Sequence, residues 1–242
     1  MNIGIDANYL IFEQAGIGKY TENIIRNLLK IDRKNQYFLY FSYLKHAQKR
    51  RKKIDDFLAG VKSKKVIVRI FPLPAAWYEF ITASGIPPFW LAKDNLDIFF
   101  APYGASVPKS TRFGKHQKPP KIVTTIHDLV FLRFPEHRGK KLSRNYLKRH
   151  KIACRNSQKL IAVSIATKND LMNLLVVDDS KIQVIYEAAA KKFHPLVKRE
   201  RKKADRIISR YFNPETKYIL SVGTLEPRKN LARLVTAFSL LP

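Results

Sequence analysis

Residues 159–175 read K-L-I-A-V-S-I-A-T-K-N-D-L-M-N-L-L, and this stretch decides the fold class. The short apolar run Lys159–Val163 predicts a buried strand, and Ser164 is a residue type that caps helix N-termini. The spacing of apolar residues then predicts a helix through Leu175. A strand that leads directly into a capped helix is a β–α unit, which needs parallel neighbouring strands to cover it.

The same alternation extends along most of the chain. Helical spacing predicts further helices at Lys19–Lys30 and at 140–156. Near-continuous apolar runs, typical of parallel strands covered on both faces, predict strands at Asn2–Asp6, Gln36–Tyr43, Lys65–Ile70, Asp97–Ala101, Lys121–Ile126 and Lys181–Tyr186. The pattern therefore favours an α/β fold with a parallel, doubly wound sheet.

Residues 217–240 begin the pattern again. Tyr218–Val222 predicts a strand, Gly223 ends it, and helical spacing follows at Leu231, Leu234, Val235 and Phe238. Only two residues come after this stretch. We expect an N-terminal domain at 1–190, a linker with a short basic helix at 191–213, and at 214–242 the start of a second domain that the chain does not complete.

The charge of the chain is strongly positive, with 46 Lys and Arg against 19 Asp and Glu and a net charge of +27. Such a chain is drawn to polyanions. The basic clusters at Lys45–Lys53, Arg138–Lys151 and Lys198–Lys203 are either solvated helix faces or a footprint on an anionic membrane surface. Nucleic acid is not expected as a partner, because no zinc-ligand spacing or aromatic RNA-binding motif accompanies the charge.

Other sequence features indicate the compartment. The single cysteine, Cys154, excludes an intramolecular disulfide and fits a reducing environment. The N-terminus lacks the basic flank and apolar run of a signal peptide, and no apolar stretch approaches the roughly 18 residues that span a bilayer. We therefore expect a cytoplasmic protein, with the basic clusters allowing peripheral attachment to the inner face of the plasma membrane.

Gly16 and Gly18 lie in G-I-G-K-Y-T, between the first strand and the first predicted helix. Ligands of open α/β sheets bind at the carboxyl ends of strands, where helix N-termini present N–H groups to phosphates. Small residues let the backbone approach a ligand closely. The segment is either a phosphate-binding loop or an ordinary tight turn.

His127 and Asp128 follow the predicted strand K-I-V-T-T-I, so both are expected at the ligand-binding edge of the sheet. A histidine there can hydrogen-bond a sugar hydroxyl or polarise a leaving group, and Asp128 could orient it. The alternative is a structural histidine at a strand end.

Glu226, Arg228 and Lys229 stand in E-P-R-K-N, just before the predicted helix of the second domain. Cations at a helix N-terminus oppose the helix dipole but suit a bound diphosphate. Solvated surface charge is the alternative. No arrangement of Cys, His or acidic residues in the sequence has the spacing of a metal site.

Taken in order, G-I-D-A-N, G-I-G-K-Y-T, T-I-H-D-L-V-F-L-R-F-P, L-I-A-V-S-I-A-T-K-N-D-L and S-V-G-T-L-E-P-R-K-N-L closely resemble retaining glycosyltransferases of family 4, especially the mannosyl- and rhamnosyltransferase-like members. The resemblance covers nearly the whole chain. It implies the GT-B fold, with a complete N-terminal Rossmann-like domain and only the first β–α unit of the C-terminal one.

The resemblance also assigns roles by motif. His127, with Asp128 beside it, would contact the transferred sugar. Gly16, Gly18, Arg228 and Lys229 would bind the donor diphosphate, with Glu226 as a further candidate. Fixed cations would stabilise the leaving nucleotide, so no metal and no cofactor beyond the nucleotide sugar is expected. The family's E-x7-E element is absent from these residues, and Y-E-A-A-A at 186–190 replaces the usual P-N-G-V-D.

We expect a hexosyltransferase that moves a mannose-like sugar from a nucleotide sugar to a lipid-linked or polysaccharide acceptor. The chain by itself is expected to be inactive, as a fragment, a frameshifted product or a half that needs a complementing C-terminal half. A non-catalytic module that binds acceptor, membrane surface or a partner remains the alternative, and a nucleic-acid binder, which rests on charge alone, is a third.

Overall fold

The computed structural model describes residues 1–12, 16–61, 65–74, 77–78, 80–81, 86–109, 119–137, 140–190, 193–213 and 216–241. The chain divides into two compact units, Met1–Glu187 and Ala188–Pro242. The predicted domain at 1–190, linker at 191–213 and second domain from 214 stay predictions.

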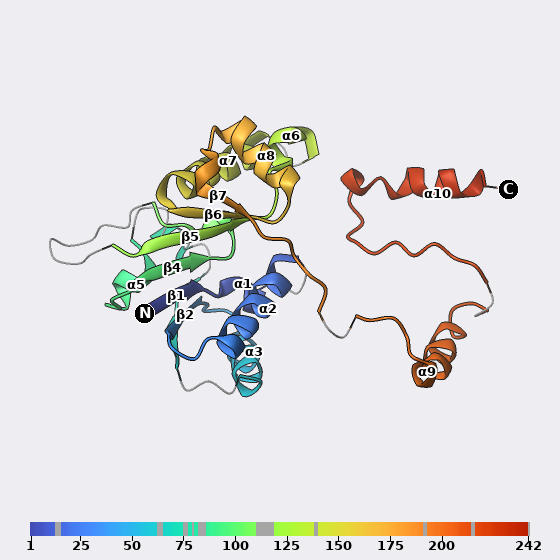
Figure 1. The fold of residues 1–242 in the computed structure, drawn as a ribbon, viewed down its shortest axis with the longest axis horizontal. Helices are drawn as coiled ribbons and strands as arrows, with labels where there is room; N and C mark the ends of the chain where they lie inside the picture. The colour runs from blue at the N-terminus through green and yellow to red at the C-terminus, as the bar shows by residue number, and fades with distance from the viewer. Residues whose placement is uncertain are drawn as a thin grey trace. The chain divides into compact units, whose positions relative to one another are not determined.

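The described strands of the first unit form one seven-stranded sheet in the order β3-β2-β1-β4-β5-β6-β7 (Figure 1). All neighbouring strands are parallel. The strands are β1 Asn2–Asp6, β2 Gln36–Ser42, β3 Val66–Phe71, β4 Ile98–Ala101, β5 Lys121–Ile126, β6 Lys159–Ala162 and β7 Ile182–Val184. Each strand predicted in this unit is present, so the prediction of a parallel α/β sheet is confirmed.

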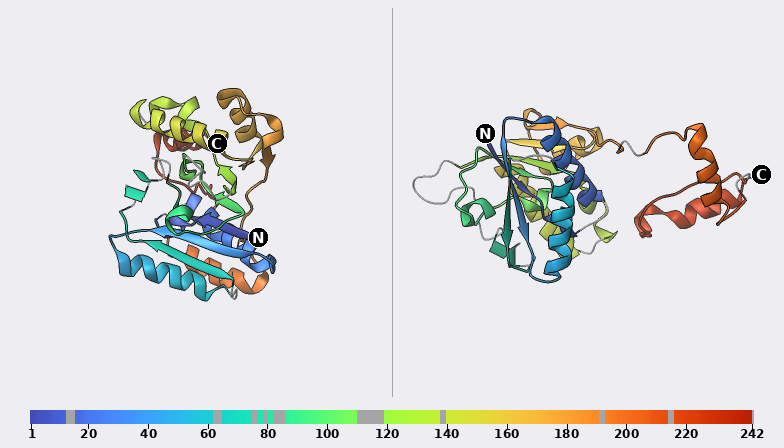
Figure 2. Two further views of the ribbon diagram at one scale, coloured as in Figure 1. Left: turned by 90° about the vertical axis from the view of Figure 1, so that its left-hand side faces the viewer. Right: turned by 90° about the horizontal axis from the view of Figure 1, so that it is seen from below.

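Helices cover both faces of the sheet (Figures 1 and 2). On one face α1 (Asn8–Phe12), α2 (Gly16–Ile31) and α3 (Ala47–Ala59) enclose what we call the α2-side core. On the other face the α7-side core is enclosed by α5 (Pro88–Leu91), α6 (Val130–Arg133), α7 (Lys140–Asn156) and α8 (Ile165–Leu175). The sheet is therefore doubly wound, as predicted.

Strand β2 shows why these strands are mostly apolar. Tyr37, Leu39 and Phe41 point into the α2-side core, whereas Phe38 and Tyr40 point into the α7-side core. Successive side chains of a strand face opposite sides, so a strand covered on both faces is buried at nearly every position and favours apolar residues there.

The strand order reverses between β1 and β4. After β1 the chain forms β2 and β3 on one side, and β4 then pairs with the other side of β1. Open α/β sheets bind ligands outside the carboxyl ends of the strands at such a switch point. The residues that follow β1 and β4 are therefore the first place to look for a site.

A buried carboxylate, Asp94, joins two strands to the segment after α5. Its Oδ2 accepts a hydrogen bond from the Tyr40 hydroxyl at 2.9 Å, and Arg69 Nε donates to the same carboxylate at 3.1 Å. Desolvation and this carboxylate together raise the pKa of the Tyr40 hydroxyl above its ordinary value. The carboxylate therefore ties β2 and β3 to the segment that leads into β4.

Two local predictions have opposite outcomes. Ser164 caps α8 as expected, because its Oγ accepts a hydrogen bond from the Thr167 backbone N–H at 3.0 Å. The loop predicted to extend to Gly18 is wrong, because α2 already begins at Gly16, three residues before the predicted start at Lys19. Both glycines belong to the first turn of the helix, where Gly18 is buried.

The second unit contains α9 (Lys198–Ile208), a 3-10 turn η4 (Pro227–Lys229) and α10 (Leu231–Ser239). The predicted basic helix and the helix after residue 230 are thus present. The predicted strand Tyr218–Val222 is wrong, because these described residues have no strand conformation. Strands exist through pairing, and no described strand pairs with this segment, whose side chains are exposed.

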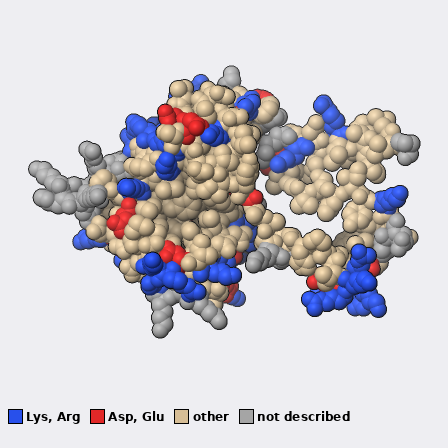
Figure 3. Space-filling view, in the orientation of Figure 1, with Lys and Arg blue, Asp and Glu red and all other residues tan. Residues whose placement is uncertain are grey.

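Lys and Arg side chains gather over α3 in the first unit and over α9 in the second (Figure 3). Among the described helices none is both long enough and apolar enough to cross a membrane.

Candidate functional site

His127 lies directly after β5, at the carboxyl edge of the sheet, and its ring is held from two sides. Its Nε2 lies 2.9 Å from the carbonyl oxygen of Pro102, which follows β4, so Nε2–H must be the donor. Its Nδ1 lies 3.2 Å from Glu187 Oε1. Both ring nitrogens thus face acceptor oxygens.

An aromatic ring also contacts the His127 side chain. The Tyr20 ring of α2 meets the imidazole edge to face, with ring centroids 4.8 Å apart. The Tyr20 hydroxyl lies 2.9 Å from Thr125 Oγ1 on β5, and desolvation raises the pKa of that hydroxyl. The first turns of α2 therefore pack over the end of β5, which brings the helix N-terminus to the same edge as His127.

Gly16 begins α2 with φ +27°, a left-handed value that favours glycine, and among the described residues other than its chain neighbours no atom lies within 4 Å of the place where a Cβ would stand. The first N–H groups of this helix have no partners within the helix itself. They carry partial positive charge, which suits an anion. Gly16 is thus open on its side-chain side, whereas Gly18 is buried.

Asp128 does not orient His127, contrary to the prediction. Its Oδ1 accepts a hydrogen bond from the Val130 backbone N–H at 3.2 Å, and the structure gives it no contact with the His127 ring. Glu187 makes the contact predicted for Asp128. The sequence reasoning missed Glu187, and the available signal was an acidic residue soon after the last strand of the sheet.

Glu226, Arg228 and Lys229 lie in the second unit, at the 3-10 turn η4 that precedes α10. Glu226 Oε1 accepts a hydrogen bond from the Thr224 hydroxyl at 2.6 Å. Lys229 is exposed, and Asn230 has φ 52° where the turn gives way to α10. The two cations thus stand immediately before a helix N-terminus, as their spacing predicted.

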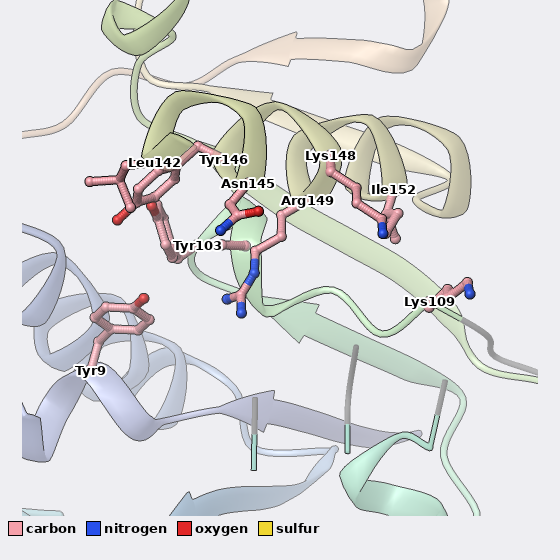
Figure 4. A pocket seen from close by; sticks show the side chains of 10 residues that line it. Tyr9, Tyr103, Lys109, Leu142, Asn145, Tyr146, Lys148, Arg149 and Ile152 are labelled. Carbon is pink, nitrogen blue, oxygen red and sulfur yellow. The ribbon is translucent and has the colours of Figure 1, made fainter. Parts of the chain in front are cut away.

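A cavity of about 420 Å³ lies between α7 and the segments that follow β1 and β4 (Figure 4). The Tyr103 ring, two residues after β4, lies 6.5 Å from the His127 ring and 5.1 Å from the Tyr9 ring of α1. Helix α7 closes the other side. The lining residues are Tyr9, Tyr103, Ala105, Lys109, Leu142, Asn145, Tyr146, Lys148, Arg149 and Ile152.

His150 lies behind the cavity wall and is buried. Its Nδ1 donates to the Tyr146 carbonyl oxygen at 2.8 Å, and its ring packs 4.9 Å from Phe131. Burial lowers the pKa of this imidazole. Its contacts are those of a packing residue that supports Tyr103 and α7.

Within the described residues, no group of three His, Cys, Asp or Glu side chains is placed to hold a metal ion. The expectation that no metal takes part stays a prediction.

Comparison with known proteins places this site in context. The family profile described as Glycosyltransferase Family 4 matches residues 15–189, well over half of the chain. O-antigen chain mannosyltransferase B of Escherichia coli is 29% identical over 123 residues, which are 50% of this chain and 31% of that protein.

Among solved structures, HepE of Anabaena in complex with UDP superposes with a TM-score of 0.58 at 13% sequence identity. The match covers 100% of this chain and 58% of HepE. At this identity the likeness is one of fold. The chain spans less than two thirds of the length of the proteins it matches.

Proposed function

Because the chain belongs to glycosyltransferase family 4, we propose that it serves the transfer of a hexose, mannose-like, from a nucleotide sugar to a lipid-linked or polysaccharide acceptor. The observation that carries the proposal is the setting of His127. Its ring is fixed at the ligand-binding edge by Pro102 and Glu187, beside the N-terminus of α2 and a cavity large enough for a sugar.

In this proposal the site residues have distinct roles. His127 contacts the transferred sugar, and Glu187 positions its ring. The N–H groups at Gly16 and the cations Arg228 and Lys229 offset the negative charge that develops on the leaving diphosphate. The relative named as a mannosyltransferase supports a mannose-like donor sugar, and the UDP in HepE supports a nucleotide-bound donor.

We propose further that the protein works in the cytoplasm on the inner face of the plasma membrane. The basic side chains of α3 and α9 are largely exposed, and Trp77 and Phe80 expose 61% and 66% of their surface. Exposed cations attract anionic headgroups, and aromatic rings favour the membrane interface. Binding to vesicles of anionic lipid at physiological salt tests this, and equal binding to neutral vesicles contradicts it.

The experiment on function uses the polypeptide as it is expressed from its own gene, because the 242 residues alone are expected to be inactive. It is supplied with radiolabelled GDP-mannose or UDP-glucose and a membrane extract as the source of acceptor. We expect label in a lipid- or polysaccharide-linked product. His127→Asn is expected to lower the rate about a hundredfold, because it removes the ring that contacts the reacting sugar. Glu187→Gln is expected to lower it about tenfold with unchanged unfolding. Transfer at the native rate by His127→Asn refutes the proposed role.

His46→Asn is the matched control. His46 is an exposed histidine at the start of α3 with φ 56°, a conformation that asparagine tolerates. We expect it to leave transfer unchanged, so that a loss specific to His127 reports on the site.

The second candidate function is a non-catalytic module that binds acceptor, membrane or a partner chain. The observation that favours it is the exposed apolar surface of the second unit, where Leu220, Val222 and Leu225 expose 75%, 88% and 91%. Exposed apolar residues in a group of this kind mark interaction surfaces. If the chain is such a binding module, or if the chain alone is inactive, we expect the 242 residues to bind glycan or lipid and to show no affinity for UDP or GDP.

A further inference from the structure

The cavity between α7 and the segments that follow β1 and β4 has two chemically different ends (Figure 4). Tyr9, Tyr103, Tyr146 and Leu142 gather at one end, whereas Lys109, Lys148 and Ile152 lie toward the other, with Arg149 between them. From Tyr146 to Ile152 the axis of α7 advances roughly 9 Å. That length suits one sugar ring with an attached charged group.

The aromatic end suits a saccharide. Tyr9 and Tyr103 meet edge to face with centroids 5.1 Å apart, and both remain partly exposed. Tyrosine rings offer a flat apolar face to the C–H groups of a sugar and a hydroxyl at the ring edge. Asn145 adds an amide with two donors and an acceptor, the kind of group that reads sugar hydroxyls.

The opposite end is basic. Lys109 and Lys148 are exposed, Arg149 is partly buried, and the described residues that line the cavity include no Asp or Glu. In the described part of the chain no salt bridge to Lys109 or Lys148 is present. Like charges on neighbouring side chains repel one another, and an anion relieves that repulsion. A phosphate offers several acceptor oxygens to a planar guanidinium and to ammonium groups at once.

Position links this cavity to the reaction. Tyr103 lies both in the cavity wall and 6.5 Å from the His127 ring, and all lining residues belong to the first unit. The described residues that line the cavity do not include Gly16, the first-unit residue proposed for the donor diphosphate. A ligand seated here is therefore distinct from the donor diphosphate and suits the acceptor.

We propose that this cavity binds a phosphorylated saccharide as acceptor, with the sugar ring against Tyr9 and Tyr103 and the phosphate against Lys109, Lys148 and Arg149. The inference rests on the proposed glycosyl transfer and deepens it, because it selects acceptors that carry a phosphate next to the sugar. The phosphate comes from a free sugar phosphate or from an isoprenoid pyrophosphate that carries the sugar.

The test is calorimetric titration of the full chain with glucose 1-phosphate, glucose, inorganic phosphate and glucose linked by pyrophosphate to a short isoprenoid. Glucose 1-phosphate is expected to bind at least tenfold more tightly than glucose, since charge-assisted hydrogen bonds are added. Lys148→Gln and Arg149→Gln are each expected to weaken this binding roughly tenfold. Lys148 is exposed, so its replacement does not threaten the fold.

Two exposed cations of the same helix serve as matched controls. Lys151→Gln and Arg144→Gln remove the same charges from α7 at positions that do not line the cavity, and binding is expected to stay within twofold. Tyr9→Leu tests the aromatic end: it is expected to weaken binding of glucose 1-phosphate and to leave binding of inorganic phosphate unchanged. Tighter binding of the isoprenoid compound identifies a lipid-linked acceptor, and equal binding identifies a free sugar phosphate.

Equal affinity for glucose and glucose 1-phosphate overturns the inference, as does an effect of Lys151→Gln as large as that of Lys148→Gln. Failure here is distinct from failure of the proposed function. If the protein transfers sugar to a neutral glycan and Lys148→Gln does not change the rate, the phosphate inference is refuted and the proposed glycosyl transfer stands. If the ligands bind as expected but no nucleotide sugar supports transfer, the inference about the cavity stands and the proposed transfer is refuted.

Discussion

Replacing Gly104 with alanine tests how tightly the wall behind the cavity is packed. A Cβ on Gly104 would stand 2.6 Å from Ile126 Cδ1 and 3.2 Å from two atoms of the His150 ring. Ile126 is fully buried, and His150 is fixed by its hydrogen bond to Tyr146. Neither side chain has room to retreat, so the added methyl group must displace the backbone or α7.

The cost follows from these distances. Overpacking a closed core by one methyl group costs about 1–3 kcal/mol. Alanine also restricts the unfolded chain, which offsets about 0.4–1 kcal/mol. We expect a net loss of about 1–2 kcal/mol in the free energy of unfolding, or about 2–8 °C in Tm for a unit of this size.

The control is Gly60→Ala, whose Cβ would also meet an atom at 2.6 Å. That atom is Nη1 of Arg26, the far end of a flexible side chain that is 33% exposed. The arginine can move aside, so we expect a change of less than about 0.5 kcal/mol. In both variants the new Cβ would stand 2.6 Å from another atom, but only in Gly60→Ala can that atom move away.

Urea unfolding followed by tryptophan fluorescence and far-UV circular dichroism measures both variants. The two tryptophans of the chain, Trp77 and Trp90, belong to the first unit, so their fluorescence reports on the unit that holds Gly104. Native stability in Gly104→Ala, or an equal loss in Gly60→Ala, refutes the packing argument.

Three further predictions concern buried polar groups. Asp94→Ala leaves the buried Tyr40 hydroxyl without its acceptor, so we expect it to lower the free energy of unfolding in urea by about 2 kcal/mol. The double variant Tyr40→Phe/Asp94→Ala should lose less than the sum of the two single variants. Burial raises the pKa of Cys154 to about 11, so the thiol should resist iodoacetamide at pH 7 in the folded chain and react after unfolding; rapid labelling of the native chain contradicts this. Burial lowers the pKa of His150 in the folded chain. As the pH falls below about 6.5, the ordinary pKa of histidine, this residue therefore binds a proton in the unfolded chain before it does so in the folded chain. Stability is therefore complete above that pH and declines below it, and His150→Phe should flatten a plot of Tm against pH between about 7 and 5.

The strands could be predicted from the sequence because burial on both faces leaves a recognisable apolar run within each strand. A strand such as β2 is buried on both faces, which leaves an apolar run that can be recognised without its neighbours. The cap at Ser164 is equally local, since its partner Thr167 is three residues away. His127 was found for a related reason, because the residue after a strand must lie at the edge of the sheet.

Features that depend on distant segments were not predicted. Glu187 reaches His127 from beyond the last strand, and the cavity combines Tyr9, the segment around Tyr103 and one face of α7. Side chains so far apart in sequence meet only after the sheet has formed. The predicted strand at 218–222 failed for the opposite reason: its composition suits a strand, but a strand also needs a partner.

Strand β1 lies inside the sheet, between β2 and β4, and this sets an order on how the chain can fold as it is synthesised. Residues 1–71 contain β1, β2, β3 and the three helices of the α2-side core, so three of the seven described strands are made early. The other edge of β1 stays unpaired until β4 is made, because Ile3 pairs with Ile98 far along the chain. Until β4 leaves the ribosome, that edge offers unpaired backbone groups to any other strand. The newly made chain therefore needs protection most at a strand that later has a partner on both sides.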